Sequence, residues 1–281
     1  MNETLWLVVN RASGSNDDAA LDGLLAAFEA ARCPPSRVID ASADDLPDRQ
    51  LLEREGVATL AVFTGDGTIN AVVPPLEGWG GAVLILPGGT ANLLAHALHG
   101  EREAAEIVAR FGAGELVRQR RTSIRSSQGT ALCEVLAGPG ATWSDVREGL
   151  RDGDLAATAS KAVEAMRQSA GGPRVVLAAP ELGSAEGYAG IRLAPLAGGM
   201  QVDGYGAESA ADVVKQGVAL LRRNFREGPH DELGTHAEAL CRSLDGSPIE
   251  LMIDGERRTG GPAERFSLAP LEVDLLSSLH G

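Results

Sequence analysis

The first third of the chain alternates short apolar runs with segments of helical periodicity. Leu21, Leu24, Leu25 and Phe28 recur at the spacing of one helix face, which predicts a helix over 17–32. The other predicted helices cover 48–55, 68–73, 91–99 and 101–111. The predicted strands cover 5–9, 37–39, 57–63 and 83–86. Strands that alternate with helices predict a parallel sheet with helices on both faces.

The pattern changes near Gly112-Ala113-Gly114. Antiparallel strands are predicted at 116–125, 131–137, 174–178, 190–194, 249–253 and 266–275. Two helices are predicted among them, at 156–168 and 209–225. The sequence therefore predicts an α/β domain over 1–113 and a mostly antiparallel β domain over 114–281. The last strands are candidates to pack back on the cleft between the two domains.

Composition narrows the class of protein. The chain has 281 residues, 44% of them hydrophobic, which is a globular composition. A net charge of −14 argues against a nucleic-acid binder and against tight attachment to an anionic membrane. The N-terminus lacks the basic start of a signal peptide, and no apolar run reaches about 18 residues. The three cysteines show no metal-ligand spacing, so we expect reduced thiols in a cytoplasmic protein.

Three glycine-containing turns follow predicted strands: NRASGSN at 10–16, TGDGTIN at 64–70 and PGGTAN at 87–92. In a parallel sheet the carboxyl ends of the strands lie along one edge, which is the usual ligand crevice. Glycine lets the backbone approach a ligand closely, and exposed N–H groups in such turns favour phosphate. One such turn is more often structural, but three on one edge favour a nucleotide site. The lysine-bearing phosphate loop Gly-x-x-x-x-Gly-Lys-Ser/Thr is absent.

The motifs Thr64-Gly65-Asp66-Gly67-Thr68 and Pro87-Gly88-Gly89-Thr90-Ala91-Asn92 resemble the paired signature of the diacylglycerol kinase catalytic-domain superfamily. Residues 10–15 are similar to the first loop of that family, and Asp254-Gly255-Glu256 is similar to its late Asp-Gly-Glu. The resemblance implies an ATP- and Mg²⁺-dependent lipid kinase in two domains. The first would be an α/β nucleotide domain like those of NAD kinases and phosphofructokinases, the second a β-sandwich-like domain, with ATP in the cleft between them.

The resemblance also implies roles for individual residues. Glu256 would be the general base, supported by Asp254, although Asp-Gly is equally a hairpin-turn signal. Asp66 would hold Mg²⁺ with the phosphates or orient the attacking hydroxyl; its structural alternative is a turn residue. The residues expected at the nucleotide are Asn10, Ser13, Gly14, Thr64, Gly65, Asp66, Gly67, Thr68, Ile69, Asn70, Gly88, Gly89, Thr90 and Asn92. For Asn70 and Asn92, bracing of the loops is an equally supported alternative to contact with the nucleotide.

A second Asp-Gly, at Asp203-Gly204, is similar to a loop that holds a structural Mg²⁺ in bacterial relatives. The ligands would be the Asp203 side chain and the carbonyls of Met200 and Tyr205; a simple turn is at least as well supported.

Two departures from the family pattern qualify the resemblance. Thr64 stands where many members have glycine, and a β-branched residue resists positive φ. Leu93 stands where many have aspartate, which removes a carboxylate that would support Asp66.

The expected acceptor is diacylglycerol or a related lipid, taken from the membrane by transient peripheral contact, as in phospholipid biosynthesis. Two alternatives stay open: an NAD kinase-like enzyme, and a catalytically weak nucleotide- or lipid-binding member. The oligomeric state is also open, a homodimer included.

Overall fold

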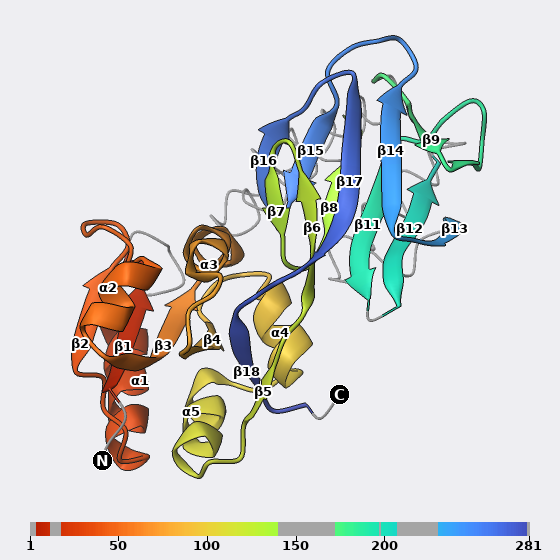
Figure 1. The fold of residues 1–281 in the computed structure, drawn as a ribbon. Coiled ribbons are helices and arrows are strands. Elements are labelled where there is room, and N and C mark those ends of the chain that lie inside the picture. Colours follow the sequence, from red (N-terminus) through yellow and green to blue (C-terminus); the bar gives the residue numbers. More distant parts are fainter. Residues whose placement is uncertain (1–3, 12–17, 140–171, 197, 207–229, 280–281) are drawn as a thin grey trace. The chain divides into compact units, whose positions relative to one another are not determined.

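The computed structural model describes residues 4–11, 18–139, 172–196, 198–206 and 230–279 (Figure 1). The chain forms two compact units, Met1–Arg121 with Pro270–Gly281, and Thr122–Ala269. The predicted Ser13 and Gly14 contacts and the predicted helices at 156–168 and 209–225 lie outside the described residues.

The first unit is built on a six-stranded sheet in the order β2-β1-β3-β4-β18-β5. Its strands are β1 (Thr4–Val9), β2 (Arg37–Asp40), β3 (Val57–Thr64), β4 (Ala82–Pro87), β5 (Val117–Gln119) and β18 (Asp274–Ser277). The strands β2, β1, β3, β4 and β18 run parallel, and β5 runs antiparallel to β18. The α/β fold predicted from the alternating pattern is confirmed.

Helices cover this sheet because its strands bury side chains on both faces. The helices are α1 (Asp18–Ala30), α2 (Arg49–Arg54), α3 (Asp66–Val72), α4 (Leu93–His99) and α5 (Ala104–Gly112), with a 3₁₀ turn η1 (Pro74–Leu76). The apolar stripe of α1 packs with α5 against alternate residues of β1, β3 and β4 in one cluster. On α1 that stripe consists of Leu21, Leu24 and Phe28, three of the four residues that predicted the helix. The neighbouring strand residues Trp6, Val8, Leu60 and Val62 are buried too, so neither face is left to solvent.

The C-terminal segment returns to the first unit, where β18 lies between β4 and β5 (Figure 1). The division expected at 113/114 therefore differs from the observed one in two ways: β5 belongs to the first unit, and so do residues 270–281. The run expected as one strand at 266–275 is two strands, β17 (Ala263–Pro270) and β18, separated by residues 271–273. Periodicity could not locate this break, because the linking residues Leu271 and Val273 are buried on either side of the exposed Glu272 and so continue the alternation of a strand.

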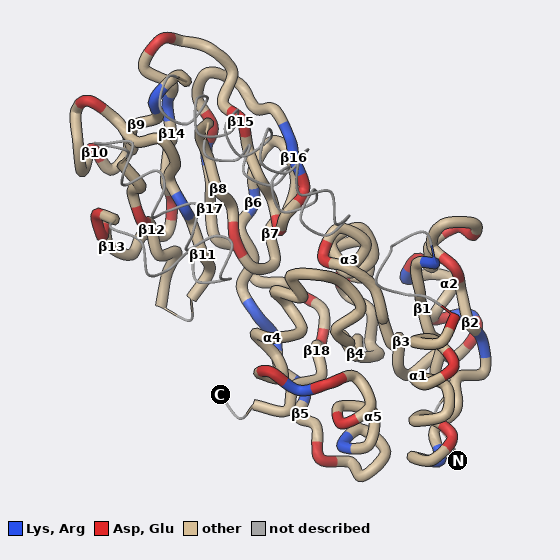
Figure 2. The backbone as a smooth tube through the Cα atoms, turned by 180° about the vertical axis from the view of Figure 1, so that it is seen from behind, with Lys and Arg blue, Asp and Glu red and all other residues tan. Residues whose placement is uncertain are grey.

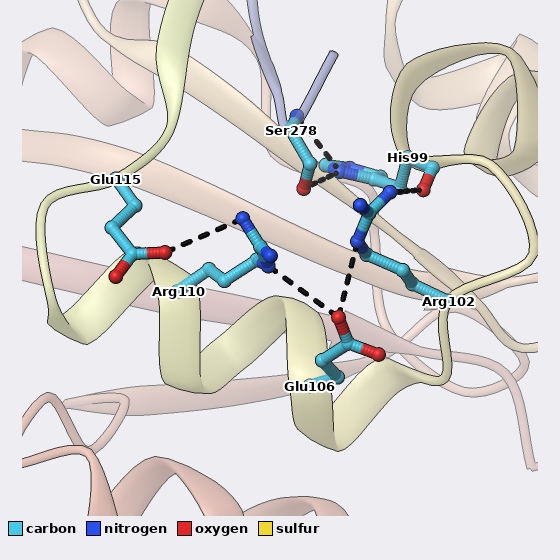
Figure 3. Close-up of polar contacts among 6 residues, drawn as sticks. All are labelled: His99, Arg102, Glu106, Arg110, Glu115 and Ser278. Atoms are coloured by element: carbon cyan, nitrogen blue, oxygen red, sulfur yellow. Dashed lines mark hydrogen bonds and ion pairs between the residues drawn. The ribbon is translucent and has the colours of Figure 1, made fainter.

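Ser277 and Ser278, at the end of β18, form hydrogen bonds with the C-terminal end of α4. The carbonyl of Leu98 accepts hydrogen bonds from the Ser277 hydroxyl at 2.7 Å and from the Ser278 N–H at 3.1 Å. Figure 3 shows the Ser278 side chain against the His99 ring, and Arg102 reaching back to the His99 carbonyl. On α5, Glu106 accepts from Arg102 and Arg110. The last carbonyls of α4, which have no partner within the helix, thus accept hydrogen bonds from these two serines and from Arg102.

The second unit contains two six-stranded sheets that share one apolar core. Their orders are β10-β9-β14-β17-β6-β7 and β13-β12-β11-β8-β15-β16. The strands are β6 (Thr122–Ser126), β7 (Gly129–Ala131), β8 (Val135–Ala137), β9 (Val175–Ala179), β10 (Glu181–Leu182), β11 (Gly190–Leu196), β12 (Gly199–Tyr205), β13 (Asp231–His236), β14 (Glu238–Ser243), β15 (Glu250–Ile253), β16 (Glu256–Thr259) and β17. Side chains from both sheets, Phe266 and Ile191 among them, form that core. The predicted antiparallel β domain is confirmed, although β10, β12, β13, β14 and β16 were not predicted as strands.

Candidate functional site

Two of the three glycine turns lie side by side at the carboxyl edge of the first sheet. Strands β3 and β4 are parallel neighbours, and their last residues, Thr64 and Pro87, are register partners. The turns that follow, Gly65-Asp66 and Gly88-Gly89, therefore begin at the same level of the sheet. This is the edge at which α/β sheets bind ligands.

The second turn needs glycine because the two turns touch. A Cβ on Gly89 would lie 2.5 Å from the Cα of Gly65, and a Cβ on Gly88 would lie 2.6 Å from the Thr64 nitrogen. Gly65 differs: its φ is −76° and a Cβ there would meet the Gly89 Cα at 3.8 Å, an ordinary contact. Gly88 and Gly89 thus serve packing of the turns, whereas the fold does not require glycine at residue 65.

Asn92 braces the second turn with its side chain. Its Oδ1 accepts the Gly89 N–H at 2.7 Å, and its Nδ2 donates to the Gly89 carbonyl at 2.9 Å. Asn92 has φ 51° and ψ 40°, a left-handed conformation that asparagine tolerates better than most residues. The bracing alternative for Asn92 is the one observed. Because Asn92 takes the Gly89 N–H, that donor is not directed at a ligand, which corrects the phosphate role expected for it.

Polar contacts join three strand ends around the first turn. Asn10, just after β1, donates from Nδ2 to the Thr68 hydroxyl at 3.1 Å. Asp66, just after β3, accepts the Leu94 N–H with Oδ1 at 3.4 Å, which connects it to α4 after β4. Both contacts bridge more than 25 residues of sequence, so the fold brings these side chains together. Asn70 and Gly67 lie within α3, and Thr90 is exposed in the second turn.

Two residues expected at the nucleotide face inward instead. Ile69 is 1% exposed and its N–H donates to the Gly65 carbonyl within α3, so it serves the core and the helix. Thr64 is fully buried, and its hydroxyl donates to the Gly65 carbonyl at 3.2 Å. Thr64 is absent from the residues with positive φ, so this β-branched residue causes no backbone strain.

The end of β2 adds an ionised carboxylate to the same edge. Asp40 accepts the Ser42 hydroxyl at 2.7 Å, the Ser42 N–H at 3.0 Å and the Arg11 N–H at 3.3 Å. These hydrogen bonds, those from Ser42 first, lower the pKa of Asp40 below its usual value. The Arg11 guanidinium lies 3.9 Å from the Asp40 carboxylate and 3.8 Å from Asp18, so its charge is already partly balanced.

In the second unit, Asp254 and Glu256 flank a tight turn between β15 and β16. Asp254 is buried, and its carboxylate accepts the N–H groups of Leu132, Cys133 and Glu134 at 2.6, 2.9 and 2.8 Å. Glu256 is exposed. No described residue forms a hydrogen bond or ion pair with its side chain. The two carboxylates thus differ: that of Asp254 is engaged in holding the turn, whereas that of Glu256 is exposed.

At the predicted cation site the Asp203 carboxylate is engaged by neighbouring side chains. Asp203 lies within β12 rather than in a turn, and its carboxylate accepts from Arg192 at 3.2 Å and Gln201 at 3.1 Å. The Tyr205 carbonyl accepts the Ala189 N–H, and Met200 is a core residue paired within the ladder. The Asp203 carboxylate expected to bind Mg²⁺ is thus paired with the Arg192 guanidinium. Among the described residues, no group of three or more Asp, Glu, His or Cys side chains lies close enough together to bind a metal ion.

Sequence reasoning did not identify Arg192 and Glu134 or the Leu94 main chain. Arg192 lies in a strand that reads as apolar, and its partners lie 11 and 58 residues away in sequence. A main-chain donor leaves no signal in the sequence at all.

Comparison with known proteins agrees with the motifs. Residues 4–123, less than half of the chain, match the model of the diacylglycerol kinase catalytic domain. A diacylglycerol kinase from Bacillus anthracis str. Sterne is 15% identical and superposes with a TM-score of 0.62, over 97% of this chain and 96% of that one. A provisionally named diacylglycerol kinase of the same organism is 13% identical, with a TM-score of 0.63 over 98% and 97%. No curated protein matches.

The predicted resemblance to the superfamily is thereby confirmed, and the structural likeness extends the shared fold to nearly the whole chain. Among the described residues, no helix is long and apolar enough to cross a membrane.

Proposed function

We propose, on the premise that residues 4–123 form a diacylglycerol kinase-like catalytic domain, that this protein transfers the γ-phosphoryl group of ATP to a lipid hydroxyl. The acceptor would be diacylglycerol or a related lipid, taken from a membrane by transient peripheral contact. The observation that carries the proposal is the pair of touching glycine turns at adjacent strand ends, with Asp66 between them. The family model covers this region.

Phosphoryl transfer requires the protein mainly to position groups and to balance phosphate charge. The fold does not require glycine at residue 65, since a Cβ there would make only an ordinary contact and its φ is negative, so a role in ligand binding would account for this glycine. Absence of a side chain there lets a phosphate approach the backbone closely. Thr68, oriented by Asn10, would add a hydroxyl donor.

Asp66 is the residue that would hold Mg²⁺. Mg²⁺ typically keeps several waters and binds one or two carboxylates together with substrate phosphates, so a single carboxylate at the turns fits this mode of binding. The bound ion would balance the charge that develops on the transferred phosphoryl group. The Leu94 N–H, 3.4 Å from Asp66 Oδ1, would help to orient Asp66 where Leu93 supplies no second carboxylate.

Glu256 would be the general base that accepts the proton of the attacking hydroxyl. A hydroxyl is a weak nucleophile at neutral pH, and a positioned carboxylate accelerates its attack by about 10²–10⁴-fold. Glu256 is exposed and uncommitted among the described residues, whereas the carboxylate of Asp254 is fully engaged.

The test is transfer of labelled phosphate from ATP to diacylglycerol in phospholipid vesicles with Mg²⁺ present. We expect transfer by the wild type, a loss of about 10²-fold or more in Glu256→Gln, and a comparable loss in Asp66→Asn. Glu238→Ala, which removes an exposed ion pair on β14, is the matched acidic control and should keep full activity. An active Glu256→Gln variant would remove the assigned base.

Two further experiments distinguish the lipid kinase from an NAD kinase-like enzyme and from a non-catalytic member. NAD replaces the lipid in one arm; formation of NADP without lipid phosphorylation would overturn the lipid assignment. In the other arm ATP binding is measured by calorimetry. Binding without transfer to any acceptor would identify a non-catalytic member.

A further inference from the structure

A cluster of three charged side chains, two of them buried, is hydrogen-bonded to the turn that precedes the proposed base. Arg192 on β11 donates from Nε to Glu134 at 2.8 Å and from Nη1 to Asp203 at 3.2 Å. Arg192 is 6% exposed and Asp203 is 2% exposed. The two stand directly opposite each other in the β11–β12 ladder, so their pairing follows from strand register.

Stability alone does not account for this cluster. Desolvation of buried ions roughly cancels their attraction, and well-packed apolar residues of similar volume are often as stable or more so. What apolar residues cannot supply is direction: the guanidinium is planar, and its Nε and Nη1 donors reach two carboxylates from fixed positions. The cluster therefore fixes where the Glu134 side chain lies.

Glu134 is held from its other side by the turn that precedes Glu256. Its N–H donates to the Asp254 carboxylate at 2.8 Å, and its carbonyl accepts the Asp254 N–H at 3.0 Å. The chain of contacts thus runs from Asp203 through Arg192 and Glu134 to Asp254. Each link is a hydrogen bond of 2.8–3.2 Å.

The turn decides where Glu256 lies, because β16 is an edge strand. Within the described sheet β16 pairs with β15 and has no neighbour on its other side. The turn residues Asp254 and Gly255 have φ of 47° and 90°, a left-handed pair typical of tight two-residue hairpins. All four residues of β16 are exposed, and Figure 2 shows the charged residues along the strand. Core packing therefore does not anchor Glu256; its place depends on its pairing with Ile253 of β15 and on the turn that the Asp254 carboxylate holds.

We infer that Arg192, acting through Glu134 and Asp254, is a positioning residue for the carboxylate of Glu256. The inference rests on the proposed function, in which Glu256 accepts the proton of the lipid hydroxyl. Arg192 itself touches no substrate. Its effect is to keep residues 132–134 in the arrangement that holds the turn.

The test uses Glu134→Ala, because Glu134 is the half-buried member and Arg192 keeps Asp203 as a partner when it is removed. We expect the kcat for lipid phosphorylation to fall about tenfold with the KM for ATP unchanged, since an error of one ångström in a catalytic group costs up to about 10²-fold. Glu134→Gln keeps an acceptor for Arg192 Nε and should restore most of the kcat. Glu238→Ala serves as the control for loss of an acidic residue in the same unit.

A second measurement does not depend on activity. Hydrogen exchange at the amides of residues 132–134, which donate to Asp254, should be at least about tenfold faster in Glu134→Ala and near wild type in Glu134→Gln. If the wild type transfers no phosphate, the proposed function fails and the exchange result alone decides whether the cluster holds the turn. Exchange and kcat of Glu134→Ala that both match Glu238→Ala would overturn the inference.

Discussion

The buried His99 ring should make the protein less stable as the pH falls below neutrality. His99 has no exposed surface, and its Nδ1 accepts the Ser278 N–H at 3.3 Å and lies 2.9 Å from the Ser278 hydroxyl (Figure 3). A ring nitrogen that accepts an N–H carries no proton itself, so the imidazole is neutral. Its Nε2 has no hydrogen-bond partner among the described residues.

Burial lowers the pKa of His99 from 6.5 to about 4, and the charge of Arg102 acts in the same direction. The main chain of Ile85 favours the protonated form but does not offset the burial. Between about pH 6.5 and 4 the unfolded chain binds a proton at this residue and the folded chain does not. Stability contributed by the neutral ring is therefore complete above pH 6.5 and lost as the pH falls through this window.

The gap between 6.5 and about 4 corresponds to about 3 kcal/mol of unfolding free energy, of which about 2 kcal/mol is lost between pH 7 and pH 5. Carboxyl groups with lowered pKa, namely Asp40, Asp245 and Asp274, stay ionised throughout that range in both states. Their contributions are lost only below about pH 4. The interval from pH 7 to pH 5 thus separates the titration of His99 from that of these carboxyl groups.

The assay is urea unfolding of the wild type and His99→Asn at pH 7, 6 and 5. Asparagine keeps an acceptor oxygen near the position of Nδ1 but does not titrate. We expect the difference in unfolding free energy between the two proteins to shrink by about 2 kcal/mol over the range. Parallel curves for the two proteins, or a His99 ring that titrates above pH 6 by NMR, would refute the reasoning.

The glycine turns and the Asp254 anchor give two further contrasts. Gly89→Ala should lower the unfolding free energy by about 1–3 kcal/mol, because the added Cβ would overlap the Gly65 Cα. Gly65→Ala should change the unfolding free energy by less than about 0.5 kcal/mol, and it should raise the KM for ATP. Equal stabilities in thermal melts would contradict this. Asp254→Ala should cost at least about 2 kcal/mol by leaving three amide donors unpaired, while Glu256→Gln should change stability little and activity strongly. A stable Asp254→Ala variant would show that the turn is held by other contacts.

Local patterns determined the elements of the first unit. The spacing of Leu21, Leu24 and Phe28 predicted α1, and continuous apolar runs predicted β1, β3 and β4. The predicted bounds lie within one or two residues of the observed ones. The paired motifs determined the family resemblance and placed two glycine turns at neighbouring strand ends. These predictions succeeded because a helix buried on one face shows a period of about 3.6 residues, and a strand buried on both faces shows a continuous apolar run.

Tertiary structure alone decided which side chains meet. Asp203 reads as a turn residue in the sequence, and it is an ion-pair partner because the register of β11 and β12 sets Arg192 opposite it. The place of β18 in the first sheet, and Asp254 as an anchor for residues 132–134, depend on contacts across more than 100 residues. Period and turn chemistry act over a few residues, whereas strand order, register and the pairing of buried charges are fixed only when distant segments pack together.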